Sequence, residues 1–240
     1  MEKRIRLSNI KKVGLNANVI KIVAVTSMFI DHFSRVITED GTAGRWGLHL
    51  IGRLAAPLIA YLVAEGHHYT SDKKAYASRM FIFALISHIP YVMYFNLGFF
   101  QATSVFWSLL MGLIALTAAK HEKLSVVWKA VIIALSLVVA VPANWHYIGV
   151  LWVLNFGLFR DKFNWKITGF VLITLLLYII PGLQEFGFFV AYRFASLLAV
   201  PFFYLYNRNP GKRTWFTKWA FYWFYPLHLI FLYVLQIFLT

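Results

Sequence analysis

The stretch VIKIVAVTSMFIDHFSRVI, residues 19–37, decides the fold class. A helix needs about 20 mostly apolar residues to cross a bilayer, and this stretch supplies them. It also carries Asp31, His32 and Arg35 toward its far end. A charge at the centre of a membrane helix costs about 2.5–3.5 kcal/mol on insertion scales, and such residues usually face a protein interior or a wet cavity. We therefore predict a membrane helix whose polar residues belong to a site.

The remaining sequence has the same character as this first helix. The chain has 240 residues, of which 60% are hydrophobic and 13% charged, and its mean hydropathy is +0.67. These values are typical of proteins that cross a membrane several times. A formal net charge of +14 would suggest a nucleic-acid partner in a soluble protein. The hydropathy argues against that partner here, and we predict none.

The absence of cysteine excludes several kinds of chemistry. A disulfide, a thiolate metal site and an acyl-enzyme formed on a cysteine all require a sulfhydryl group. His67 and His68 are adjacent, but no Cys or carboxylate stands at ligand spacing from them. We therefore predict no metal site.

Apolar runs predict an all-α, polytopic membrane bundle of about nine helices. The predicted spans are residues 19–37, 48–65, 78–96, 103–119, 125–141, 145–159, 166–181, 186–205 and 220–238. The range 145–159 is short for a full span. Connections are short, so we predict one transmembrane domain, residues 19–240, preceded by a basic cytoplasmic or interfacial segment, residues 1–18.

Basic residues predict the orientation of this bundle. With nine alternating helices, most of the 23 Lys and Arg residues fall on one side of the membrane. They are Lys3, Arg4, Arg6, Lys11, Lys12, Lys21, Lys73, Lys74, Arg79, Lys120, Lys123, Lys129, Arg160, Lys162, Lys166, Arg208, Lys212, Arg213 and Lys218. The opposite loops hold Arg45, with Arg35 close by. The positive-inside rule then places the N-terminus in the cytoplasm and the C-terminus outside.

Polar residues from different predicted helices converge on one depth. On this topology Asp31, His32, Arg53 and Arg193 lie in the outer half of the membrane, whereas His88 and His228 lie near mid-depth. Such groups normally face a bundle interior or a cavity and mark function. We therefore expect them to surround a shared cavity.

Simpler structural roles for these polar residues stay open. Asp31 and Arg35 are spaced i, i+4 and can pair on one helix face. Arg53 can instead pair with Asp31, beside the kink that Pro57 favours by lacking a backbone N–H. His88 and His228 lie close to prolines and can be structural. Glu65, at the cytoplasmic end of its helix, can serve either packing or a site.

Several stretches, in this order, resemble one known family. They are FIDHF (29–33), IGRLAAPLIAYLVAEG (51–66), RMFIFALISHIPY (79–91), VFWSLLMGLIAL (105–116), RFASLLAVPFFYLYN (193–207) and FYWFYPLHLIFLYVL (221–235). Together they are similar to the TraX family of integral membrane proteins, associated with acetylation of conjugative pilin and distantly similar to multispanning membrane acyltransferases. The resemblance covers roughly residues 18–238.

The resemblance implies an acetyltransferase that uses cytoplasmic acetyl-CoA as acyl donor. It implies functional positions at Asp31, His32, Arg53, Glu65, Arg193 and His228. The chain departs from the family pattern at Ala56, at Val92 and at Asn144-Trp145. The last two departures remove carboxylates, so the acceptor can differ from pilin.

The mechanism expected from these residues is direct acyl transfer. His32 is the expected base, because imidazole titrates near neutral pH. Arg53 and Arg193 would stabilise the oxyanion or bind an acceptor anion, His228 is the reserve base or donor, and Asp31 orients another group. The binding positions predicted for the donor and substrate are Glu65, Lys73, Lys74, Arg79, His88, Lys129 and Lys218. Expected partners are membrane lipids, acetyl-CoA and an acceptor that is a protein N-terminus, a glycan or a small molecule.

Two other classes of function use the same residues. A small transporter or channel would also bury ionisable groups, although the odd helix number and the lack of an internal repeat argue against it. A structural partner of a secretion complex would use Asp31 and Arg53 as a buried ion pair.

Overall fold

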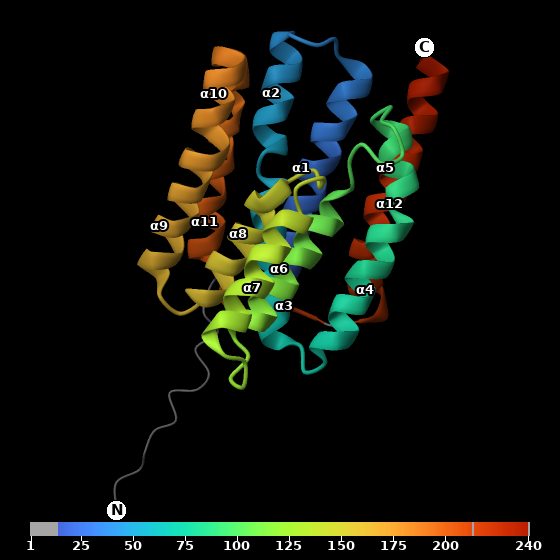
Figure 1. Ribbon diagram of the computed structural model, residues 1–240. Helices are drawn as coiled ribbons and strands as arrows, with labels where there is room; N and C mark the ends of the chain where they lie inside the picture. The colour runs from blue at the N-terminus through green and yellow to red at the C-terminus, as the bar shows by residue number, and fades with distance from the viewer. Residues whose placement is uncertain (1–13, 213, 240) are drawn as a thin grey trace, which may run out of the picture.

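Helices account for all the regular elements of the computed structural model, which describes residues 14–212 and 214–239 (Figure 1). Their bounds are α1 Ala17–Ile37, α2 Ala43–Gly52, α3 Ala55–Tyr69, α4 Lys73–Ile86, α5 His88–Tyr94, α6 Val105–Ala119, α7 Val126–Val139, α8 His146–Leu158, α9 Phe163–Thr174, a π-helical turn Leu175–Ile179, α10 Ile180–Phe186, a 3₁₀ segment Gly187–Ala199, α11 Val200–Leu205 and α12 Trp215–Leu239. The predicted all-α class is therefore confirmed.

Each of the nine predicted spans falls on helical structure, although several are interrupted. The range 48–65 falls on α2 and α3, and the range 78–96 falls on α4 and α5. Three continuous stretches are long and apolar enough to cross a membrane, namely Ala43–Tyr69, Phe163–Leu205 and Trp215–Leu239. The stretch Phe163–Leu205 contains two predicted spans, because the chain turns at Gly187, where φ is +64°. The number of crossings and their orientation stay predictions.

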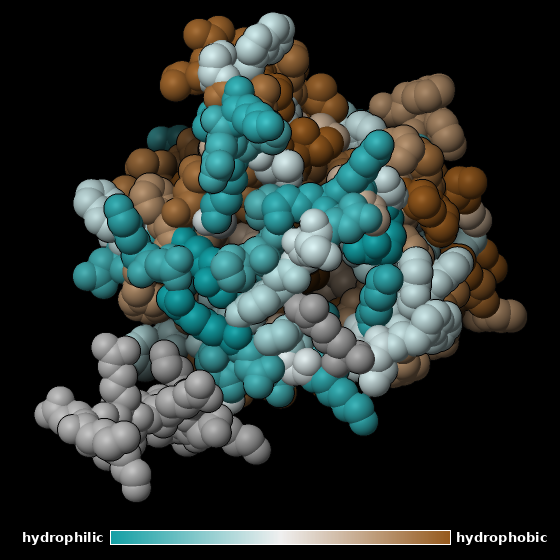
Figure 2. Space-filling model, turned by 90° about the horizontal axis from the view of Figure 1, so that it is seen from below, coloured by the Kyte–Doolittle hydropathy of each residue, from teal (hydrophilic) through white to brown (hydrophobic). Residues whose placement is uncertain are grey.

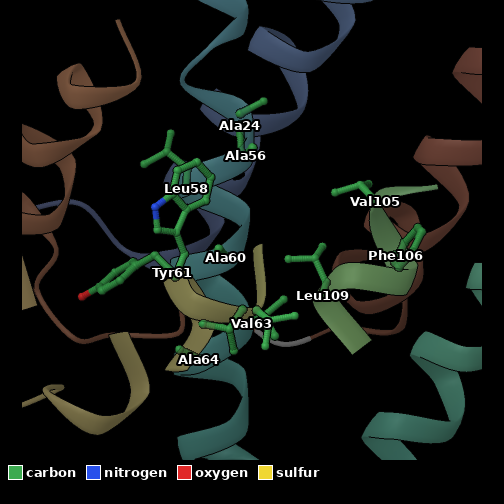
Figure 3. Packing of buried hydrophobic residues seen from close by; sticks show 14 of the residues in the cluster. Ala24, Ala56, Leu58, Ala60, Tyr61, Val63, Ala64, Val105, Phe106 and Leu109 are labelled. Atoms are coloured by element: carbon green, nitrogen blue, oxygen red, sulfur yellow. The ribbon is translucent and has the colours of Figure 1, made fainter. Parts of the chain in front are cut away.

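The centre of the bundle is formed by α1, α3, α6 and α8. Helix α3 packs against α1 on one side and against α8 on the other, and α6 packs against α8. Figure 3 shows α3 with its small residues Ala56, Ala60 and Ala64, and it shows Val105 and Leu109 of α6 pointing toward α3. Small residues let membrane helices approach closely, where van der Waals packing stabilises them.

Glycines permit the close contact between α6 and α8. A Cβ on Gly112 would lie 2.8 Å from Cβ of Val153, and one on Gly157 would lie 2.4 Å from the Leu116 side chain. The absence of side chains at these two positions therefore sets the distance between the helices.

Helix α7 lies at the outside of this core. Its one buried residue is Ser136, whereas Val126, Leu135 and Val138 are exposed. An apolar helix with so little buried surface fits contact with lipid chains rather than with water.

The two ends of the bundle differ in polarity. One end, which we call the basic end, carries the connections α3–α4, α6–α7, α8–α9 and α11–α12. Figure 2 views the molecule from this end and shows many hydrophilic side chains there. At this end Arg208 donates a 2.6 Å hydrogen bond to Asp161, and this bond lowers the pKa of the Asp161 carboxyl. Of the predicted basic segment 1–18, residues 1–13 lie outside the described residues, as does Arg213.

Candidate active site

Asp31 lies at the centre of a buried charged cluster. Its Oδ1 atom accepts a 2.5 Å hydrogen bond from Nη2 of Arg53, and Nδ1 of His49 lies 2.7 Å from the same oxygen. Asp31 and His49 are 7% and 8% exposed. Among the described residues the salt-bridge partners of Asp31 are Arg53 and His49. The alternative pair of Asp31 with Arg35 is therefore wrong. The Arg35 guanidinium instead lies over the Phe95 ring at 5.2 Å.

The local sequence of α2 and α3 explains how Arg53 reaches Asp31. Helix α2 ends at Gly52 and α3 begins at Ala55, so Arg53 lies at the break between them. The kink beside Arg53 that we expected from Pro57 is therefore present. The absence of a side chain at Gly52 makes room for the Asp31 carboxylate. A Cβ there would lie 2.2 Å from Oδ1 of Asp31, so the carboxylate occupies the space of a side chain.

We expect Gly52→Ala to displace the Asp31 carboxylate and disrupt its bonds to Arg53 and His49. Steric overpacking of a filled interior costs about 1–3 kcal/mol, and the loss of charge pairing adds to that cost. The change would appear as a lowered melting temperature of the purified protein in detergent. Gly47→Ala is the matched control, because it lies on the same helix with no atom within 4 Å of the new Cβ. Equal melting temperatures for the two variants would contradict the assignment.

Arg53 and Arg193 both contact Tyr178, in the π-helical turn. Nη1 of Arg53 donates to the Tyr178 hydroxyl at 2.9 Å, and Nη1 of Arg193 donates to the Tyr178 backbone carbonyl at 2.9 Å. A π-helical turn inside an α-helix frequently marks a functional site. Arg193 is thus linked to Asp31 through Tyr178 and Arg53.

His32 and His228 form a second buried pair. Nδ1 of His32 lies 2.8 Å from Nε2 of His228, and the two ring planes differ by 3°. Both residues are at least nine-tenths buried. The Tyr94 hydroxyl donates to the backbone carbonyl of His32 at 2.6 Å, which ties α5 to the same point of α1. His32 of α1 and His228 of α12 thus meet across the bundle, a contact between two positions that the sequence analysis had singled out separately.

Hydrogen bonds fix the tautomers of this pair when both rings are neutral. Nδ1 of His228 lies 2.8 Å from the Phe224 carbonyl oxygen, which can only accept, so this nitrogen carries the proton. Nε2 of His228 is then an acceptor, and Nδ1 of His32 must donate to it. The lone pair of His32 therefore resides on Nε2, which has no hydrogen-bond partner among the described residues. A neutral imidazole in this state can accept a proton from a substrate.

A deep pocket extends from the basic end toward the histidine pair. Its volume is about 720 Å³, within the range of ligand pockets. Along α1 the lining runs from Ala17 to Met28, about 16 Å at 1.5 Å per residue. Basic residues line its outer part, namely Lys21, Arg79, Lys212 and Lys218. Figure 2 looks onto the end that carries them.

The inner end of the pocket lies one helical turn below the histidines. Met28, its innermost lining residue on α1, precedes His32 by four positions, and Tyr225, its counterpart on α12, precedes His228 by three. The rings of Tyr225 and His228 are 5.4 Å apart. The expectation of one cavity shared by all the polar groups needs correction, because Asp31, His32 and Arg53 do not line this pocket.

The predicted binding residues separate into two groups. Glu65, Arg79 and Lys218 line the pocket, and Nε of Arg79 is buried without a hydrogen-bond partner among the described residues. Glu65 is fully engaged, because both its carboxylate oxygens accept from Arg160, at 2.8 and 3.1 Å.

The other predicted binding residues lie elsewhere. Lys73, Lys74, His88 and Lys129 are absent from the pocket lining. Lys73 donates to the carbonyls of His67 and Thr70, and His88 lies 2.8 Å from the Phe99 carbonyl oxygen. Lys129 belongs to the outer helix α7. Their assignment to a phosphate or substrate site therefore finds no support in the geometry.

Three members of the polar clusters were missed from the sequence. His49 precedes Arg53 by four positions, so helical spacing could have revealed it. Tyr178 and Arg160 are contributed by distant segments, and no local pattern marks them as partners of Arg53 and Glu65.

The fold and the buried clusters define a helical membrane protein with an ionisable site inside its bundle. The chain belongs to the TraX family, because the family model described as "TraX protein" matches residues 16–236. It is 25% identical over 244 residues to a "Probable fimbrial assembly protein FimC, serogroup H1" from Dichelobacter nodosus, with 95% of this chain and 99% of that protein covered. No solved structure matches it.

Proposed function

We propose that this protein is an acetyltransferase of the bacterial inner membrane that takes its acetyl group from cytoplasmic acetyl-CoA. The observation that carries the proposal is the pocket with a basic mouth whose inner end lies one turn below the His32–His228 pair. On this proposal the basic end faces the cytoplasm, as the positive-inside rule favours.

The outer part of the pocket suits the nucleotide end of the donor. Phosphate groups bind to Arg and Lys through charge-assisted hydrogen bonds, and Arg79 and Lys218 both line the pocket there. The buried Nε of Arg79 offers a donor with no partner among the described residues. The pantetheine arm then follows α1 inward, and the thioester reaches the level of Met28 and Tyr225.

His32 is the general base of the proposed reaction. Its Nε2 takes a proton from the acceptor amine or hydroxyl while the nucleophile attacks the thioester carbonyl carbon. The tetrahedral intermediate collapses with cleavage of the carbon–sulfur bond. The thiolate leaves and takes the proton held by His32, which gives free CoA, the acetylated acceptor and a neutral His32. His228 holds the tautomer of His32 through the Phe224 carbonyl.

Arg53 and Arg193 serve this reaction indirectly. Both terminal nitrogens of Arg53 have partners, Asp31 and Tyr178. Its guanidinium therefore fixes Asp31, the residue next to the base, and Arg193 fixes the π-helical turn that supplies Tyr178. On this proposal both arginines position other groups rather than binding the oxyanion themselves.

The acceptor approaches from the membrane or the outer side. His228 also lines a second groove, of about 510 Å³, whose other lining residues include Phe29, Trp223 and Phe231. A groove of such apolar side chains fits an acceptor that is itself partly embedded in lipid. The name of the Dichelobacter nodosus relative, a probable fimbrial assembly protein, favours a pilin-like protein over a glycan or a small molecule.

The same name supports one alternative function. A structural assembly partner would need the buried Asp31–Arg53 pair for stability but would have no use for a pocket that binds a CoA ester. Donor binding therefore separates the two functions.

We expect the purified protein to bind acetyl-CoA, and Arg79→Gln and Lys218→Gln each to weaken that binding about tenfold. A hydrogen bond to a charged group contributes about 1.5–3 kcal/mol, and 1.4 kcal/mol corresponds to a factor of ten. Lys129→Gln is the matched control, because it removes the same charge from a helix outside the pocket. Isothermal titration calorimetry in detergent gives the dissociation constants.

Turnover is then measured as the CoA released when a short peptide with a free N-terminal amine serves as acceptor. Because the chain has no cysteine, a thiol reagent reports only the released CoA. Absence of acetyl-CoA binding by the wild-type protein would rule out the proposed enzyme and favour the assembly function.

A further inference from the structure

The inner end of the pocket is closed by three large side chains from three helices. Met28 of α1, Phe106 of α6 and Tyr225 of α12 all line it and are 8%, 9% and 3% exposed. The Phe106 and Tyr225 rings meet edge to face at 5.4 Å. Figure 3 shows Phe106 at the start of α6, beside Val105. We call these three residues the end wall of the pocket.

The order of lining residues on each helix shows that this is the end farthest from the basic mouth. On α1 and α12 the lining runs from Ala17 and Trp215 at the basic end to Met28 and Tyr225. Helix α6 runs in the opposite direction and ends at the basic end, where Lys120 caps it. Its first residues, Val105 and Phe106, are therefore its deepest lining residues. Helices α1 and α12 therefore place their deepest lining residue in the end wall, and α6 places one of its two deepest there.

The end wall borders the histidine pair through Tyr225. The aromatic chain Phe106, Tyr225, His228 and His32 is continuous, with ring centroids 5.4, 5.4 and 5.1 Å apart. An acyl group carried in on a thioester meets Met28 and Tyr225 before it meets His32. A short acyl group fits against this wall with its carbonyl close to the pair.

A longer acyl group cannot take the same position. Protein interiors are packed at crystal-like density, so the end wall yields little to an inserted chain. Each added methylene would move the thioester carbonyl back toward the basic mouth and away from His32. We propose that Met28 and Tyr225 determine the acyl-chain length of the donor and restrict it to acetyl. This inference depends on the proposed transfer from a CoA ester.

The test compares butyryl-CoA with acetyl-CoA as ligands, since butyryl adds two methylenes. Wild-type protein should bind butyryl-CoA at least tenfold more weakly than acetyl-CoA. Met28→Ala removes side-chain volume at the end wall, and burial of two methylenes there should improve the butyryl-to-acetyl binding ratio by about tenfold or more. The ratio of the rates at which CoA is released from the two esters, with the peptide amine as acceptor, should shift in the same direction.

Met80→Ala is the matched control. Met80 lines the same pocket and is 1% exposed, but it belongs to α4, which contributes no residue to the end wall. The same substitution there should leave the binding ratio unchanged. Tyr225→Leu, which opens the wall from a different helix, replaces Met28→Ala should that variant fail to fold.

The outcomes separate the two levels of the proposal. Wild-type protein that binds neither CoA ester would overturn the acyltransferase itself. Wild-type protein that binds acetyl-CoA while Met28→Ala and Tyr225→Leu keep the wild-type ratio would overturn only the role of the end wall. An equal shift in Met80→Ala would show that pocket volume in general, and not the end wall, sets the preference.

Discussion

His32→Ala should abolish acetyl transfer while leaving acetyl-CoA binding intact. General-base catalysis contributes about 10²–10⁴-fold to rates, and no other described histidine has a free acceptor nitrogen one turn above the pocket. The binding constant should stay within about twofold, because His32 does not line the pocket. CoA release and calorimetry on the same preparation measure both quantities.

His228 variants give this first prediction its control. In His228→Gln an amide oxygen can still accept from Nδ1 of His32, so the tautomer and part of the rate should survive. In His228→Leu nothing holds that proton, and the rate should fall further. A His32→Ala variant with normal transfer would remove His32 from the mechanism, and equal rates for the two His228 variants would remove the tautomer argument.

Arg53→Met should destabilise the protein by about 3–5 kcal/mol, the usual cost of leaving a buried charge without its partner. Asp31 is 7% exposed and receives a 2.5 Å bond from Arg53, so in the variant its carboxylate keeps only His49. The melting temperature in detergent, or the midpoint of denaturant unfolding, measures the loss.

The double variant Asp31→Asn/Arg53→Met tests whether charge is the cause. It removes both members of the pair, and replacing a buried ion pair by neutral groups is often close to neutral. The double variant should therefore be more stable than Arg53→Met alone. If it is less stable by the sum of the two single effects, the residues act independently and the ion pair does not hold α1 to the α2–α3 break.

Much of the fold could be predicted from residue patterns. Apolar runs located nine helical ranges, and Pro57 located the break near Arg53. The helix bounds differed where polar residues were tolerated inside a helix, as at Ala43–Gly52, which begins before the predicted span 48–65. Helix formation depends on neighbours in sequence, so such patterns suffice to predict it.

The site was only partly predictable. Asp31, His32, Arg53 and His228 were singled out because ionisable residues in apolar segments need a reason, and the structure places all four in two adjacent clusters. Lys73, Lys74, His88 and Lys129 were chosen for charge or for a nearby proline, and they lie outside the pocket. Charge alone does not tell which side of a helix faces a cavity.

By itself the sequence determined that this is an all-helical membrane protein with ionisable groups inside it, because hydropathy and charge are sums over neighbouring residues. Only the tertiary structure decided the partners. His32 and His228 are 196 positions apart, and Arg53 and Tyr178 are 125 apart. Their contacts follow from how α1, α12 and the π-helical turn pack, and packing depends on the shapes of distant surfaces. The free lone pair on His32 and the end wall below it are consequences of that packing.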